Sequence, residues 1–284
     1  MPELPEVETI RRTIEPQIQG LTVEEVTIRR TEVSAYPAAD EFCRRMAGQT
    51  ISGMSRRGKF LTIVLESGDR VILHLRMTGC LLLTPAGYPE EKHTHIIFHL
   101  CGGKELRFAD MRRFGRFWLL RKGEDDTYSG IGKLGLEPFD ASLTAEYLHT
   151  CLGKRRKTVK ECLLEQTTVA GIGNIYADEI LFTAGIHPAR SADDLRTEEW
   201  ERLAAVIPER LSYFIEKNHI TPEEYLETKG RDYRNTPFLQ VYGHAGEPCP
   251  VCGNRLCRLV IGGRGSVHCT VCQNRESRRQ IVAE

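Results

Sequence analysis

The sequence has no excess of charge of either sign. Its 284 residues include 39 Lys and Arg and 39 Asp and Glu, so the formal net charge is zero. Overall charge therefore gives no argument for a nucleic-acid partner, and such an argument must come from local clusters. No apolar run reaches the ~18 residues of a membrane span, and no signal peptide precedes the first motif. We expect a soluble, cytoplasmic protein with no membrane partner.

The chain also lacks internal repeats, low-complexity segments and the cysteine pattern of a disulfide framework. Five of its ten cysteines are scattered and are expected to be reduced thiols: Cys43, Cys80, Cys101, Cys151 and Cys162. The other five lie near the C-terminus. The pair Cys249 and Cys252 is followed, after 16 residues, by the pair Cys269 and Cys272. This spacing predicts one structural Zn²⁺ held by four thiolates, which leave no open position for catalysis. Cys257 falls outside both pairs, and no redox cofactor is implied.

The first residues carry an unusual nucleophile if Met1 is removed. Pro2 would then hold the free α-amine, whose pKa of about 8 leaves more of it neutral at pH 7 than a lysine. Condensation of this secondary amine with an aldehyde gives an iminium that has no N–H to lose and stays cationic. The adjacent Glu3 offers a carboxyl for proton transfer. The plain alternative is that Pro2 and Pro5 only begin a helix, which the apolar spacing predicts over residues 5–18.

Short β-type runs follow this helix, at residues 22–29, 50–55, 61–65, 71–75, 96–100 and 118–120. Turn signals separate them, which favours an antiparallel sandwich or barrel. Residues 122–140 have the composition of a linker. After them the pattern becomes helical, with one long helix predicted from Thr197 towards Ile215. The sequence thus predicts an α+β fold with a β-sandwich domain (1–121), the linker, a helical domain (141–240) and a zinc ribbon (241–284).

Three polar motifs in the second half suit phosphate binding, although each could be only a solvated turn. Arg156 and Lys157 belong to a basic run that precedes a helix. A glycine turn at residues 171–173 opens another helix, where exposed amides attract anions and Asn174 adds a side-chain donor. Arg264 has glycines on both sides, which would let its guanidinium approach a phosphate closely and bidentately.

Three motifs together resemble one known family, and the resemblance covers essentially the whole chain. They are residues 2–9 (PELPEVET), residues 171–176 (GIGNIY) and the four-cysteine ribbon. In this combination and order the chain is similar to the formamidopyrimidine-DNA glycosylase/endonuclease VIII family. The resemblance implies a helix–two-turn–helix unit in the helical domain and a bifunctional DNA glycosylase and AP lyase. Catalysis would use Pro2 as nucleophile, Glu3 for protons at the sugar, and Lys59 and Arg264 at phosphates and in proton donation.

The resemblance also implies a set of DNA contacts. Met77 matches the residue that enters the duplex where a base has been extruded. Arg112 and Phe114 match residues that fill the gap and face the orphaned base, a task that suits a planar cation and an aromatic wedge. His93 matches a DNA-contacting histidine; with His95 it could equally be structural. The expected partner is damaged double-stranded DNA, bound by a monomer in the nucleoid and kinked between the two domains.

One segment departs from the family pattern. Members specialised for 8-oxoguanine carry a Gly-Gly pair and an Arg in a loop that caps the extruded base. In the comparable stretch, residues 218–225, the glycines are absent, Pro222 stiffens the chain and Glu223 stands where Arg is expected. We therefore predict weak excision of 8-oxoguanine. Three alternatives remain: an endonuclease VIII-like preference for oxidised pyrimidines, a protein that binds damaged or abasic DNA without excision, and a zinc-ribbon interaction module.

Overall fold

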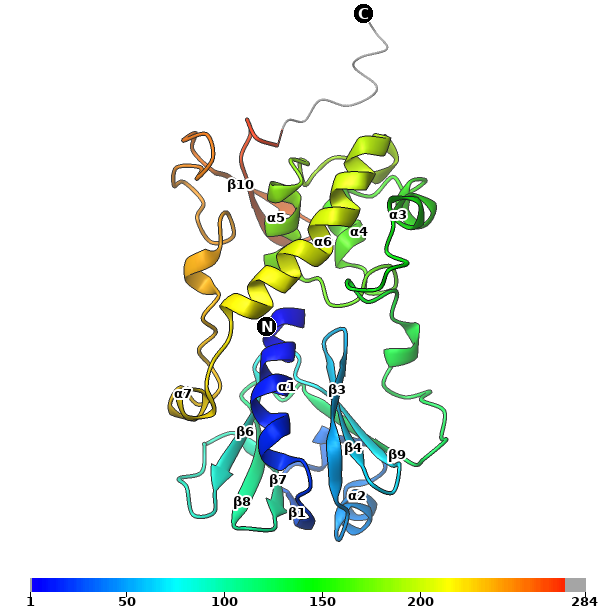
Figure 1. Cartoon of the computed structure of the whole chain (residues 1–284), viewed down its shortest axis with the longest axis vertical. Coiled ribbons are helices and arrows are strands. Elements are labelled where there is room, and N and C mark those ends of the chain that lie inside the picture. Colours follow the sequence, from blue (N-terminus) through cyan, green and yellow to red (C-terminus); the bar gives the residue numbers. More distant parts are fainter. Residues whose placement is uncertain (1, 274–284) are drawn as a thin grey trace, which may run out of the picture. The chain divides into compact units, whose positions relative to one another are not determined.

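The computed structural model describes residues 2–273, which form two compact units (Figure 1). The first unit contains the chain up to Gly132 together with Asn218–Arg234. The second contains Lys133–Lys217 and, within the described residues, 235–273. The predicted linker, residues 122–140, contains the point where the chain leaves the first unit and enters the second, between Gly132 and Lys133. Met1, whose removal the N-terminal chemistry requires, lies outside the described residues.

Two β-sheets make up most of the first unit. The four-stranded sheet has the order β1-β7-β8-β6, and the five-stranded sheet has the order β2-β9-β5-β4-β3. Every neighbouring pair is antiparallel except β2 and β9. The strands are β1 (Val23–Ile28), β2 (Ser34–Tyr36), β3 (Ile51–Arg57), β4 (Phe60–Leu65), β5 (Arg70–His74), β6 (Gly79–Pro85), β7 (Thr94–Leu100), β8 (Lys104–Asp110) and β9 (Arg116–Leu120). The predicted sandwich is confirmed, and all six predicted runs are strands.

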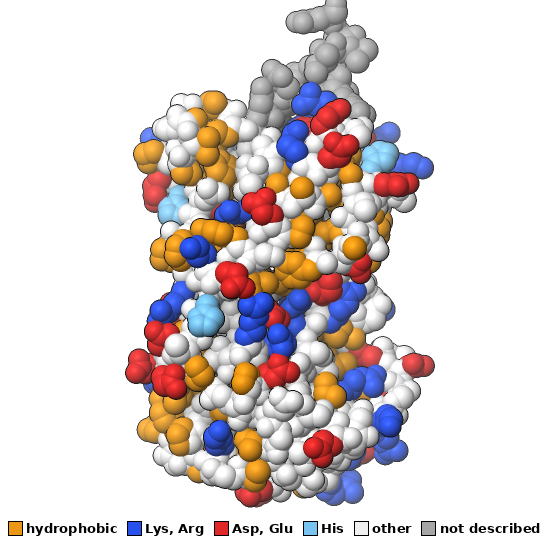
Figure 2. All heavy atoms as spheres, in the orientation of Figure 1, with side chains coloured by type: hydrophobic (Ala, Val, Ile, Leu, Met, Phe, Trp, Pro, Cys, Tyr) orange, Lys and Arg blue, Asp and Glu red, His pale blue; other side chains and the backbone are white. Residues whose placement is uncertain are grey.

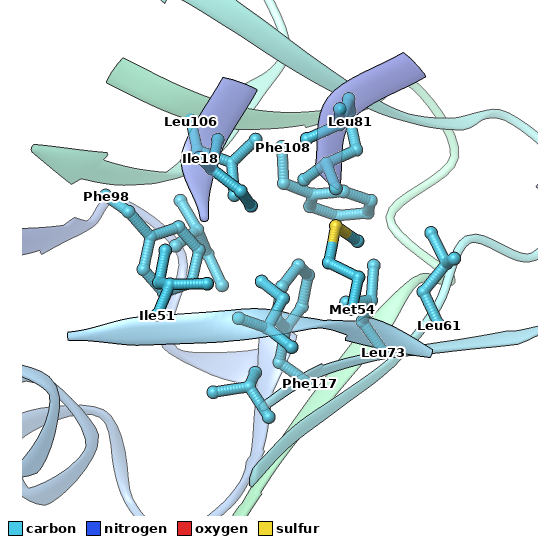
Figure 3. Close-up of a cluster of buried hydrophobic side chains, with 14 of the residues drawn as sticks. Ile18, Ile51, Met54, Leu61, Leu73, Leu81, Phe98, Leu106, Phe108 and Phe117 are labelled. Carbon is cyan, nitrogen blue, oxygen red and sulfur yellow. The ribbon is translucent and has the colours of Figure 1, made fainter. Parts of the chain in front are cut away.

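The core of the first unit lies between these sheets. Phe117 of the five-stranded sheet contacts Phe98 and Phe108 of the other, with ring centroids 6.2 and 5.0 Å apart. Met54 and Leu81 belong to the same cluster, as Figure 3 shows. Burying one such side chain contributes about 1.5–3 kcal/mol. Because side chains alternate along a strand, this inward set also fixes which residues face outward.

Helix α1 (Leu4–Ile18) covers part of the sandwich, and it packs against β3. Its buried face includes Val7, Ile10 and Ile14, as the apolar spacing predicts. Pro16 lies in the last turn and does not end the helix. The backbone N–H that proline lacks costs the helix one hydrogen bond, close to its end. The shorter helix α2 (Ala39–Met46) also belongs to this unit and was not predicted from the sequence.

Residues 218–234 correct one domain boundary, because they fold with the first unit and not with the helical domain. Residues expected to form a capping loop instead begin helix α7 (Pro222–Glu227). The reason is local: Thr221 caps the helix, Pro222 occupies its first turn and Glu224 completes a capping box. Tyr225 is buried, and its hydroxyl donates to the carbonyl of Leu81 at 2.9 Å.

The second unit is helical and carries a small β-hairpin. Its helices are α3 (Ala145–Leu152), α4 (Val159–Leu164), α5 (Asn174–Thr183) and α6 (Thr197–Lys217), and its strands are β10 (Cys257–Ile261) and β11 (Arg264–His268). Four residues predicted to share one face of α6 are all buried in the core of this unit: Trp200, Leu203, Ile207 and Leu211. The predicted combination of helices and a C-terminal ribbon is confirmed.

Surface charge follows the balanced composition. On the face drawn in Figure 2, Lys and Arg side chains are interspersed with Asp and Glu. None of the helices within residues 2–273 is both long and apolar enough to cross a membrane.

Candidate active site

Pro2 lines a pocket of about 430 Å³ in the first unit. The other lining residues come from four separate stretches of sequence: Met77, Thr78, Gly79, Cys80, His93, Met111, Gly230, Arg231 and Tyr233. Pro2 itself is buried apart from what it presents to this pocket. The structure therefore brings Pro2 together with two of the predicted DNA-contact residues, Met77 and His93.

Helix α1 fixes the position of Pro2 and Glu3. The Glu3 backbone N–H donates to Glu6 Oε2 at 2.7 Å, and the Glu3 carbonyl accepts from the Val7 N–H at 3.0 Å. Glu3 is 2% exposed, so its carboxyl lies inside the protein beside the nucleophile that the sequence predicts. Because these bonds anchor the first turn, the N-terminal amine is attached to a rigid element.

Lys59 and His74 lie together on the five-stranded sheet. Lys59 is buried in the turn between β3 and β4, and His74 ends β5. The His74 ring packs edge-on against Phe60, with centroids 4.5 Å apart, and its Nδ1 accepts from the Arg76 N–H at 2.9 Å. Burial, with the positive charges of Arg76 and Lys59, lowers the pKa of His74 to about 3. His74 is therefore neutral at physiological pH, with its proton on Nε2.

Met77, Arg112 and Phe114 form one exposed cluster. Arg112 Nη1 lies 2.9 Å from Met77 Sδ, and its Cζ lies 5.0 Å from the centre of the Phe114 ring. Met77 is 44% exposed and Phe114 is 48% exposed, which is unusual for apolar side chains of this size. The three residues predicted to enter DNA thus meet in space, although Met77 is far from the other two in sequence.

Asp110, which the sequence did not single out, organises the loop that carries Arg112 and Phe114. Its Oδ1 accepts from the Arg112 N–H at 3.1 Å, and its Oδ2 accepts from the Gly115 N–H at 2.8 Å. The Asp110 carbonyl lies 2.8 Å from His95 Nε2, so this histidine has a structural bond while His93 lines the pocket. An Asp immediately before a turn is a local signal that could have identified this role.

The pocket wall formed by Gly230, Arg231 and Tyr233 was also missed. Lys229 Nζ lies 2.7 Å from Glu91 Oε1, and this bond holds the pKa of Glu91 below its ordinary value. None of residues 218–225 lines the pocket. The wall of the pocket therefore does contain a glycine and an arginine, Gly230 and Arg231, but they lie beyond residues 218–225, the segment compared with the family's capping loop.

Cys80 holds this wall against strand β6. Its Sγ lies 3.2 Å from the Lys229 carbonyl and 3.5 Å from that of Gly230, and burial raises the pKa of the thiol to about 11. Gly230 has φ of +62°, and a Cβ there would lie 2.6 Å from Cys80 Sγ and 2.7 Å from the Tyr225 hydroxyl. Only glycine fits this position.

In the second unit, the β10–β11 hairpin places Arg264 near Asn174. Asn174 Nδ2 donates to the Gly265 carbonyl at 3.1 Å, and Arg264 is exposed at the start of β11. Under the hairpin, Asp178 of α5 accepts from Lys160 Nζ at 2.7 Å and from Ser266 Oγ at 2.6 Å. Because Lys160 and Asp178 are both fully buried, this ion pair ties helices α4 and α5 to the hairpin.

The other two predicted phosphate ligands precede α4. Arg156 is exposed, as expected for a residue that meets a partner. Lys157 Nζ lies 2.8 Å from Glu165 Oε1, and this bond raises the pKa of the ammonium. Lys157 is exposed, so water and salt screen the pair and the ammonium can exchange one anion for another.

The four ribbon cysteines converge as a metal site requires. Their Sγ atoms all lie within 4.8 Å of one another, and the Cys249–Cys272 and Cys252–Cys269 distances are 3.8 and 3.4 Å. Tetrahedral zinc with Zn–S bonds of about 2.3 Å needs sulfurs about 3.8 Å apart. The donor set and its dimensions therefore fit zinc, and Cys257 takes no part.

Comparison with known proteins matches successive parts of the chain to domains of formamidopyrimidine-DNA glycosylase. Family models match in order: the formamidopyrimidine-DNA glycosylase N-terminal domain at residues 1–117, its H2TH domain at 134–224, and the zinc finger found in FPG and IleRS at 246–275. The chain is 44% identical to formamidopyrimidine-DNA glycosylase of Desulforamulus reducens over 96% of this chain and 99% of that one. It is 45% identical to formamidopyrimidine-DNA glycosylase of Moorella thermoacetica over 91% of this chain and 94% of that one.

Among solved structures, Lactococcus lactis FPG in complex with DNA containing an oxidised pyrimidine matches with a TM-score of 0.88 and 34% identity. That match covers 96% of this chain and all of the other. The chain belongs to the formamidopyrimidine-DNA glycosylase family. It is accordingly a DNA glycosylase for oxidised bases, with the AP lyase activity typical of this family. The zinc-finger match and the cysteine geometry together confirm one structural zinc.

Proposed function

We propose that the Pro2 amine is the nucleophile that removes the damaged base and then cleaves the DNA strand. The observation that carries this proposal is the position of Pro2, buried at the wall of a pocket between His93, Met77 and the Gly230–Tyr233 segment. The volume of about 430 Å³ is that of a small-molecule site. A base extruded from a duplex enters such a pocket.

In the glycosylase step, the Pro2 nitrogen bonds to C1′ of the damaged nucleotide, and the bond from C1′ to the base breaks. The base departs with the electron pair and takes up a proton, which balances the proton that the Pro2 nitrogen releases after it has bonded to C1′. Glu3, buried beside Pro2, delivers a proton to the sugar oxygen as the ring opens. The product is an iminium between Pro2 and C1′, which cannot lose its charge because the nitrogen carries no hydrogen.

In the lyase step, the cationic iminium acidifies the C2′ protons. Loss of one of them expels the 3′ phosphate by β-elimination, and a second elimination expels the 5′ phosphate. Lys59 and Arg264 bind phosphates and donate protons to the departing groups. Lys59 is buried near the neutral His74, which suits a cation that must meet a phosphate away from bulk water.

The remaining predicted residues hold the DNA. The exposed cluster of Met77, Arg112 and Phe114 fills the space left by the extruded base and faces the base opposite. His93 contacts the DNA at the pocket. In the second unit, contacts to the phosphate backbone come from three further residues: Asn174, Arg156 and Lys157.

Borohydride trapping on an abasic duplex tests the chemistry directly. Reduction converts the iminium into a stable bond, so the wild type should give a covalent protein–DNA adduct. Pro2→Gly should give less adduct, because the imine of a primary amine can lose its proton and is then less readily reduced. Pro5→Ala, which changes a proline of the same turn, should trap as well as the wild type. Wild-type protein that binds abasic DNA without an adduct would contradict catalysis by an amine nucleophile.

The preferred lesion is a separate question. Lactococcus lactis FPG has been seen with an oxidised pyrimidine and, as a mutant, with Fapy-dG. We propose ring-opened and oxidised bases as substrates, with oxidised pyrimidines as the second candidate, and 8-oxoguanine as a weak substrate. A panel of single-lesion duplexes ranks them by cleavage rate. If a duplex with 8-oxoguanine opposite cytosine is cleaved as fast as one with a ring-opened purine, 8-oxoguanine is not a weak substrate.

We further propose that the protein acts as a monomer in the cytoplasm, bound to the nucleoid. Damaged duplex DNA is then its only required partner. Sedimentation with and without a lesion duplex tests the stoichiometry, and a complex of two chains with one duplex would contradict it.

A further inference from the structure

A second pocket, of about 500 Å³, lies beside the Pro2 pocket in the first unit. Its lining is dominated by cationic and imidazole side chains: Arg29, Arg30, Lys92, His93, Thr94, His95, Met111 and Arg113. His93 and Met111 line both pockets, so the two hollows share a wall. None of the residues that line the second pocket is acidic.

The positive charge of this pocket is only partly neutralised by the protein. Arg29 pairs with Glu90. The neighbouring Glu91 is engaged by Lys229 at 2.7 Å and Arg231 at 3.5 Å. Among the described residues, no ion pair is recorded for Arg30, Lys92 or Arg113, and all three are exposed. Three cations that converge on one hollow repel one another, which disfavours this arrangement unless an anion enters it.

The backbone conformation of Arg113 is a further sign that this pocket binds a ligand. Arg113 has φ of +58°, in the left-handed region that residues with a Cβ rarely adopt. Arg76 and Lys229, with φ of +58° and +55°, are the other two such residues within residues 2–273. Arg76 precedes Met77 and Lys229 precedes Gly230, so all three lie at or next to the two pockets. Strain of this kind concentrates at ligand-binding sites.

We propose that the second pocket binds a phosphate of the duplex backbone, outside the nucleotide that Pro2 engages. Arg30, Lys92 and Arg113 are its ligands, and Arg29 joins them by exchanging Glu90 for the phosphate. A phosphate suits the site because guanidinium forks and an ammonium bind its oxygens directly. Through the shared wall at His93, the contact sets the register of the strand relative to the Pro2 pocket. This inference rests on the proposed function.

The salt dependence of DNA binding tests the proposal. Affinity for duplex DNA falls with salt by a logarithmic slope of roughly 0.9 per neutralised phosphate. Arg30→Gln combined with Lys92→Gln should make the slope shallower by about 0.9, whether or not the duplex contains a lesion. The control Arg44→Gln removes an exposed cation from helix α2 of the same unit and should leave the slope unchanged. An unchanged slope in the double variant would overturn the proposal.

A second measurement identifies the phosphate. Neutral methylphosphonates placed one at a time along both strands should weaken binding of the wild type at every contacted position. One of those positions should lose its effect in the double variant, since its partner is already gone. If every position affects wild type and variant equally, the pocket binds no backbone phosphate. Borohydride trapping by the same proteins tests the Pro2 nucleophile separately from the phosphate site. The double variant keeps Pro2 and should still form the adduct at saturating DNA.

Discussion

The Pro2 pocket and the ribbon hairpin that carries Arg264 are held in place by different forces. The pocket is built on an apolar sandwich, and its wall is fixed by a buried thiol and by a closely packed glycine with positive φ, Gly230. The hairpin has little apolar core of its own and depends on four cysteines and the buried Lys160–Asp178 pair. A small element without a large core needs such staples.

Because only the ribbon hairpin depends on the metal site, we predict that metal removal affects the ribbon and the sandwich unequally. Structural zinc contributes about 10–16 kcal/mol of binding free energy in zinc-finger peptides. Cys252→Ser, or a strong chelator, should therefore unfold the ribbon and abolish strand cleavage, while the sandwich stays folded. The two tryptophans provide separate reporters, since Trp118 lies in the first unit and Trp200 in the second.

Single-tryptophan proteins measure this difference. With Trp200→Phe, the remaining Trp118 should give the same urea midpoint before and after chelation. Cys257→Ser is the matched control, because that thiol lies outside the metal site and its loss should change neither zinc content nor cleavage. A fall in the Trp118 midpoint on chelation would show that the sandwich also depends on the metal.

Asp178→Asn should produce the next largest effect. It leaves the Lys160 ammonium buried without its counter-charge, which costs about 3–5 kcal/mol. Ser266 also loses the carboxylate that accepts its hydrogen bond. With Trp118→Phe, the Trp200 signal should report this loss as a lower urea midpoint. The double variant Lys160→Met, Asp178→Leu should be more stable than Asp178→Asn alone; equal stability would mean that the pair is not the source of the effect.

His74 makes the stability of the sandwich depend on pH. Its pKa is about 3 in the folded protein and about 6.5 in the unfolded chain, so the unfolded chain binds the extra proton between these values. Stability from this group is complete above pH 6.5 and falls as pH drops, by about 2 kcal/mol at pH 5. His74→Asn should remove that part of the slope in urea titrations followed by Trp118. Parallel slopes for the two proteins would show that His74 is not neutral in the folded state.

Gly230→Ala should destabilise the first unit by about 1–3 kcal/mol, because φ is positive and the added methyl group crowds its neighbours, and it should change activity selectively. The added Cβ must displace Cys80 or Tyr225, which moves the wall of the Pro2 pocket. We expect base excision to slow about tenfold, or about 1.4 kcal/mol, while cleavage of a preformed abasic site is unchanged. Gly87→Ala is the matched control: its φ is +80° and no atom lies near its Cβ position. Equal losses on both substrates would mean that the wall does not contact the base.

The sequence predicted features whose signals are local. Cysteine spacing gave the zinc site, apolar periodicity gave α1 and the face of α6, and short β-type runs between turn signals gave the sandwich. It failed where a local pattern was assigned to the wrong structure. Thr221, Pro222 and Glu224 form a helix start, yet comparison with a loop in related proteins masked that signal.

The sequence by itself predicted the zinc ligands, and it supplied the candidates for the proposed nucleophile and the proposed DNA contacts, because each is a property of residue type or of short spacing. Only the tertiary structure decided what surrounds Pro2. Cys80, Glu91 and Gly230 carry no motif, and they act together because the sandwich and the chain after α7 fold into the same unit. Contacts between residues about 140 positions apart depend on the packing of the whole unit, which no local pattern specifies.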